Sequence, residues 1–149
     1  MTSQPNTLAL TVERVIPASV DEVFDSWLDP KIPGTLWNYA SKLIFDPRVD
    51  GLFYVLVISN QRETAHYGRF LAIDRPGRIQ HTFVSPNTRG LESVVTVTFQ
   101  KKGDETLMRL HHEGLPDDDK GRGHEDGWNF FLGRLVEHFS ANRASRVGR

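Results

Sequence analysis

The chain has 149 residues, a length that fits a single domain with a buried core. Its 18 Lys and Arg and 19 Asp and Glu give a net charge of −1, so no broad basic surface exists to bind nucleic acid, and we expect no nucleic-acid partner. Cysteine is absent, which excludes disulfides and thiolate chemistry. No apolar stretch is long enough to span a bilayer and the first residues do not resemble a secretory signal, so we expect a cytoplasmic protein with no membrane span.

The first predicted elements are one strand and two short helices. Apolar and polar residues alternate over 8–16, which predicts a half-buried strand. Ser19 is followed three residues later by Glu22, the spacing of a capping box, and a helix of about ten residues should follow. Asp29-Pro30 ends this helix, and 31–38 has room for at most one short helical turn because a proline and a glycine interrupt it.

The middle of the chain alternates with a period of two and is interrupted by turn signals. It predicts strands over 43–45, 52–59, 65–73, 78–84, 92–100 and 105–113. No helical pattern separates these strands, so neighbouring strands should run antiparallel rather than as a parallel sheet.

The last predicted element is a long amphipathic helix over 117–142. Its apolar residues recur at spacings of three and four, and they are Trp128, Phe131, Leu132, Leu135, Val136 and Phe139. Asp117, Asp118 and Asp119 should cap its start, and nearby glycines weaken the first turns, so regular helix is expected from about His124.

These elements predict an α+β fold in which a curved antiparallel sheet of about six to seven strands wraps around the long C-terminal helix, with two short helices after the first strand. We expect one domain over 1–149, with a core over about 8–142 and flexible tails at 1–7 and 143–149. Nothing in the sequence indicates an internal repeat or a linker between domains.

Several short motifs resemble one known family. They are Ile16-Pro17-Ala18-Ser19, Trp27 with Asp29-Pro30, Trp37, the run 46–51, Tyr67-Gly68, the run 75–79, the run 95–99, and Gly127-Trp128. In their order and spacing they resemble START-like (SRPBCC, helix-grip) domains, and in particular the branch related to the C-terminal domain of the activator of Hsp90 ATPase homologue. The chain departs from that pattern at Asp50, where the family often has glycine, and at Asn38, where it often has a second tryptophan.

The resemblance implies a cavity between the concave face of the sheet and the long helix. It therefore implies a domain that binds a small apolar ligand, such as a lipid or polyketide-like molecule, and that needs no cofactor. Two alternatives stay open: a cofactor-independent enzyme of the cyclase or dehydratase type, and a co-chaperone or protein-interaction module with an Hsp90-type chaperone as its partner. Relatives often form homodimers, so a homodimer is a further expectation by analogy.

Ten residues are expected to line this cavity. They are Trp37, Phe53, Tyr67, His81, Phe83, Met108, His112, Trp128, Phe131 and Leu132. Any of the aromatic ones could instead fill a packed core.

Two histidines stand out among these residues. His81 and His112 share strand faces with apolar residues, so either imidazole could orient a polar group on a ligand, or could simply meet a backbone carbonyl. Together with Tyr67 they are the candidate acids or bases of the enzyme alternative.

A metal site is not expected. In His111-His112-Glu113 and in His124-Glu125 the potential ligands are sequence neighbours, without the spacing of four residues that places two histidines on one face of a zinc-binding helix.

Overall fold

The structure of the chain is a computed structural model that describes residues 6–147. Seven strands form one sheet: β1 (Thr7–Ile16), β2 (Lys42–Phe45), β3 (Leu52–Ser59), β4 (Arg62–Asp74), β5 (Arg78–Phe83), β6 (Ser93–Lys102) and β7 (Glu105–Pro116). The helices are α1 (Val20–Trp27), α2 (Asp119–Arg122) and α3 (His124–Val147), with short 3-10 helices η1 (Leu36–Tyr39) and η2 (Pro86–Thr88). The predicted α+β fold class, the strand number and the two short helices after the first strand are confirmed.

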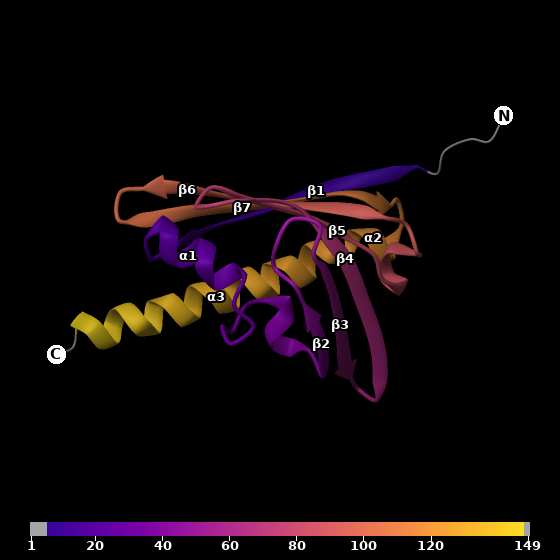
Figure 1. Cartoon of the computed structure of the whole chain (residues 1–149), viewed down its shortest axis with the longest axis horizontal. Helices are drawn as coiled ribbons and strands as arrows, with labels where there is room; N and C mark the ends of the chain where they lie inside the picture. Colours follow the sequence, from indigo (N-terminus) through magenta and orange to yellow (C-terminus); the bar gives the residue numbers. More distant parts are fainter. Residues whose placement is uncertain (1–5, 148–149) are drawn as a thin grey trace.

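The sheet is antiparallel throughout, and its strand order is β1-β7-β6-β5-β4-β3-β2. The first two strands of the chain therefore lie at opposite edges. Figure 1 shows how the sheet bends, so that α3 runs along its concave side with α1 beside it. α3 packs on β1, whereas α1 packs on β6 and β7. This is the helix-grip arrangement that the sequence predicts.

The helix ends follow the predicted capping signals. The Ser19 hydroxyl accepts a hydrogen bond from the Glu22 amide (3.3 Å), which starts α1. The Asp118 carboxylate accepts from the Gly121 amide (3.0 Å) and starts α2. Regular helix resumes at His124, as the glycine content predicts.

The α3 helix continues to Val147, beyond the expected end of the core at 142. In this extension the Arg143 guanidinium contacts Asp104 (3.1 Å) and Glu105 (3.2 Å) at the β6–β7 hairpin. Of the expected flexible tails, 1–5 and 148–149 lie outside the described residues.

One continuous core fills the space between the sheet and the helices. From α3 it takes four residues of the predicted apolar stripe, Trp128, Leu132, Leu135 and Phe139, and the other two, Phe131 and Val136, are partly buried against it. Its centre is aromatic, because the Trp37 ring meets the Phe53 ring edge-on at 5.0 Å. No helix in the described part of the chain is apolar over the length that crossing a bilayer needs.

Two glycines of the sequence motifs sit where the backbone has no room for a side chain. A Cβ added at Gly51 would lie 2.0 Å from the Asp46 carbonyl oxygen. One added at Gly68 would lie 2.1 Å from the Thr82 carbonyl oxygen. At the departure from the family pattern, Asp50 adopts a left-handed φ of 67°, a conformation that glycine reaches with less strain.

Candidate functional site

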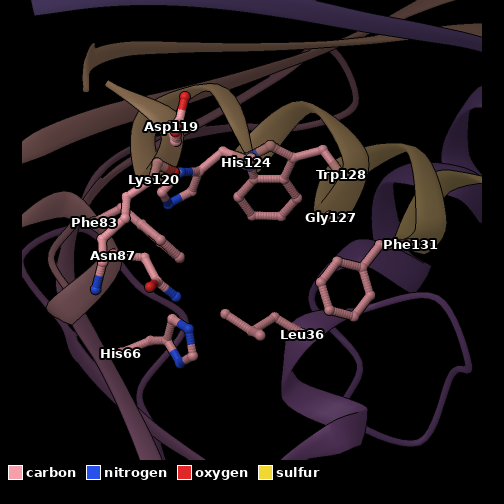
Figure 2. A pocket seen from close by; sticks show the side chains of 11 residues that line it. Leu36, His66, Phe83, Asn87, Asp119, Lys120, His124, Gly127, Trp128 and Phe131 are labelled. Carbon is pink, nitrogen blue, oxygen red and sulfur yellow. The ribbon is translucent and has the colours of Figure 1, made fainter. Parts of the chain in front are cut away.

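A pocket of about 320 Å³ opens beside the N-terminal half of α3. Figure 2 shows it between α3 and the side chains that come from η1, β4, β5 and η2. The residues that line it are Leu36, His66, Phe83, Asn87, Asp119, Lys120, Gly123, His124, Gly127, Trp128 and Phe131. An adjacent depression of about 290 Å³ shares Leu36, His66, Asn87 and Phe131 with it.

One side of the pocket is apolar. The Trp128 ring lies 5.6 Å from the Phe83 ring and 5.9 Å from the Phe131 ring, and Leu36 continues this wall from η1 (Figure 2). Helical spacing places Trp128 and Phe131 next to one another on α3. The wall offers flat rings to a ligand and few polar atoms.

Two imidazoles also line the pocket: His124 lies beside Trp128 on α3, and His66 lies across from them on β4 (Figure 2). His124 Nδ1 lies 3.0 Å from the Lys120 carbonyl and 3.2 Å from the Gly121 carbonyl. Carbonyls only accept hydrogen bonds, so Nδ1 carries the proton and Nε2 of a neutral His124 is an acceptor. Burial is the main reason that the pKa of His124 and that of His66 are both lowered, so both rings are neutral near pH 7.

A buried chain of hydrogen bonds holds the Trp128 ring in place. Trp128 Nε1–H donates to His112 Nδ1 (3.0 Å), so the proton of this imidazole is on Nε2. Nε2–H then donates to the Ser93 hydroxyl (2.8 Å), which donates to the Phe83 carbonyl (2.5 Å). Burial is the largest reason that the pKa of His112 is lowered to about 2, and neighbouring histidines, when protonated, lower it too. His112 is therefore a neutral support for the pocket wall.

His81 lies deeper. It contacts a backbone carbonyl, the role expected as the alternative to orienting a ligand. Its Nδ1–H donates to the Thr82 carbonyl (2.8 Å), and its ring meets those of Phe53 (5.1 Å) and Phe70 (5.6 Å). Burial lowers the pKa of His81 to about 4, against the smaller opposing effect of the carbonyl. Its Nε2 has no hydrogen-bond partner among the described residues.

The ten residues expected to line a cavity lie in three places. Phe83, Trp128 and Phe131 line the pocket, and His112 supports it from behind. A second group is buried in the core: Trp37, Phe53, His81, Met108 and Leu132. Tyr67 is half exposed and lies on the other face of β4 from the buried Phe70.

Sequence reasoning did not identify several pocket residues, namely Leu36, His66, Asn87, Lys120 and His124. A signal for one of them was present, because His66 has the same strand parity as Phe70 and must face the same side of β4. Leu36, Asn87 and Lys120 come from short helices, where no periodicity marks the inward face, and His124 is the first residue of α3. Over residues 6–147, no three His, Asp or Glu side chains converge closely enough to hold a metal ion.

Comparison with solved structures shows the same fold in bacterial proteins of low sequence identity. CV1439 from Chromobacterium violaceum is 21% identical with a TM-score of 0.76, over 88% of this chain and 96% of that one. Mll3558 from Rhizobium loti is 23% identical with a TM-score of 0.74, over 89% and 97%. CalU16 from Micromonospora echinospora is 21% identical with a TM-score of 0.68, over 92% and 79%.

No curated protein sequence matches the chain significantly. A family model, described as Activator of Hsp90 ATPase homolog 1-like protein, matches residues 17–140. The match spans the chain from the end of β1 to the last buried turn of α3. It is a START-type family, whose fold is that of ligand-binding or polyketide cyclase-like domains. The chain therefore belongs to the Activator of Hsp90 ATPase homolog 1-like protein family.

Proposed function

We propose that the protein binds a small, largely apolar molecule in the pocket beside α3. The observation that carries this proposal is the wall made by Trp128, Phe131, Phe83 and Leu36 around a volume of about 320 Å³. Small-molecule sites have this composition, with many apolar and aromatic groups and a few polar ones that set the orientation of the ligand.

The size of the pocket limits the ligand class. A volume of about 320 Å³ is near the lower end of the usual range for such sites, roughly 300–1,000 Å³. One or two fused rings, or a short acyl chain, would fill it. A polyketide-like ring or a single lipid chain fits this limit, whereas a whole two-chain lipid does not.

The candidate acids and bases Tyr67, His81 and His112 do not line the pocket, which favours binding over catalysis by these residues. His81 and His112 are buried and neutral, and neither lines the pocket, nor does Tyr67. A general acid or base must reach the reacting atoms within hydrogen-bond distance. A homodimer and a chaperone partner remain predictions.

Two glycines of α3 provide a matched test. An added Cβ meets nothing within 4 Å at Gly127, which lines the pocket, or at Gly133, which does not. Leucine at either position also favours the helix, by up to about 1 kcal/mol relative to glycine. Gly127→Leu therefore adds a large side chain to the pocket lining, and Gly133→Leu is the control with the same chemistry.

We expect the neutral probe 2-naphthalenemethanol, at saturating concentration, to raise the melting temperature of the wild type and of Gly133→Leu by several degrees, because it binds only the folded state. Gly127→Leu should show no such rise. Equal rises in all three proteins would place the probe elsewhere and contradict the proposal.

A further inference from the structure

We propose that the ligand carries a carboxylate, which Lys120 and Asn87 bind at the polar side of the pocket while its apolar body lies against Trp128 and Phe131. This inference rests on the proposed function, because it concerns the same pocket. It adds the chemical class of the ligand, a small monoanionic acid with a flat or short apolar body.

The first argument is the charge of Lys120. Its ammonium group has no carboxylate partner among the described residues, although it lines the pocket. The other cations nearby are paired. Arg89 contacts Asp118, and Arg122 contacts Asp117 (3.3 Å). Lys120 is thus a cation that an incoming anion can reach without breaking an existing ion pair.

The second argument concerns Asp119, which also lines the pocket and has the opposite charge. Its carboxylate is exposed to solvent and accepts a hydrogen bond from Arg122 (3.0 Å), which also contacts Asp117. Figure 2 shows the Asp119 side chain directed away from His66 and Asn87. Lys120 is therefore the cation of the lining on the side of Asn87, and both imidazoles are neutral near pH 7.

The third argument is the separation of polar and apolar groups. In Figure 2, Lys120, Asn87 and His66 lie on one side of the pocket, with the Phe83 ring beside them, and Trp128, Phe131 and Leu36 lie on the other. A ligand with an anionic group at one end matches this division, because its charge meets the ammonium and the Asn87 amide while its rings meet rings.

The number of donors sets the charge of the ligand. The lining holds a single cation and a single amide side chain, since the two imidazoles are neutral. Recognition of a phosphate dianion usually uses several cations or backbone amides. One ammonium and one amide suit the two oxygens of a carboxylate.

Two probes of matched shape test the inference by calorimetry. The acid 2-naphthoate and the neutral 2-naphthalenemethanol share the same ring system, so their difference in affinity reports the polar group. We expect 2-naphthoate to bind the wild type up to about fivefold more tightly at low salt, since Lys120 is exposed and a charge pair there contributes up to about 1 kcal/mol. Added salt should reduce this ratio.

Lys120→Gln should remove the preference for the acid, because it should weaken binding of the acid more than binding of the alcohol. Lys102→Gln removes the same charge at the end of β6, away from the pocket, and should keep the preference. If the alcohol binds the wild type as tightly as the acid does, the anion inference is overturned while the proposed function stands. If neither probe binds, both fail.

Discussion

Alanine at Gly68 should lower the free energy of unfolding by about 3 kcal/mol or more, because overpacking a well-packed site has effects of this size. The added Cβ would lie 2.1 Å from the Thr82 carbonyl oxygen and 2.7 Å from two atoms of the Phe53 ring. Neither neighbour can yield easily. The Thr82 carbonyl belongs to β5 and accepts from His81, and the Phe53 ring is packed among Trp37 and Phe70.

Gly127→Ala is the matched control for Gly68→Ala. Its Cβ meets nothing within 4 Å, and alanine is the better helix former, so the free energy of unfolding should rise by up to about 1 kcal/mol. Urea denaturation followed by far-UV circular dichroism measures both variants, and their midpoints can be compared if the slopes agree. A Gly68→Ala midpoint close to that of the wild type would show that β4 and β5 can separate at this point without loss of packing.

The second large effect is loss of stability as the pH falls from about 6.5 towards 4. Burial depresses the folded-state pKa of His81 to about 4 and that of His112 to about 2, from the ordinary value of 6.5. Below 6.5 the unfolded chain binds protons that the folded chain excludes, so acid favours unfolding. At about pH 5 each histidine should lower the free energy of unfolding by about 2 kcal/mol, or about 4 kcal/mol together.

The other groups with a shifted pKa either lower the free energy of unfolding in the same pH range or titrate at lower pH. The lowered pKa values of His66 and His124 add to the loss in the same range. Hydrogen bonds lower the pKa of two carboxyls: Arg75 donates to Asp25, and the Gly121 amide is the main donor to Asp118. Protonation of these carboxyls lowers the free energy of unfolding only below their ordinary pKa of 3.8. The interval from 6.5 to about 4.5 therefore reports mainly the histidines.

His81→Leu provides the comparison for this pH dependence. It removes one titrating group, so the loss of unfolding free energy between about pH 7 and pH 5 should shrink by about 2 kcal/mol. Slopes should be compared rather than absolute stabilities, because the variant also removes the hydrogen bond to Thr82. Above about pH 7.5 the two proteins should run parallel. An unchanged slope at lower pH would mean that His81 accepts a proton inside the folded protein at its ordinary pKa.

Periodicity predicted the elements well because the sheet and α3 each have one buried face. The stripe of Trp128, Leu132, Leu135 and Phe139 is buried as the helical spacing indicates. The sequence placed the end of α3 too early because no apolar stripe marks its last residues, and the contact of Arg143 with the hairpin acids is one that local pattern does not contain.

The pocket was predicted less well than the fold, for a physical reason. Alternation along a strand says which side chains turn inward, but not whether they meet other side chains or open space. Phe53 and Phe83 both face inward, yet Phe53 is enclosed by aromatic neighbours and Phe83 borders the pocket. That difference depends on residues such as Leu36 and Asn87, which lie in short 3-10 helices outside the strands and so outside their alternation.

The partnership of β1 with β7 has a consequence for the order of assembly. Thr11 pairs with His111, which is 100 residues further along the chain. During synthesis β1 leaves the ribosome first. It cannot pair until β7, its neighbour in the finished sheet, has been synthesised. Closing so large a loop is entropically unfavourable and slows folding. Nascent chains that lack β7 should therefore expose the apolar face of β1, making this strand the natural target of chaperones that hold unfinished chains.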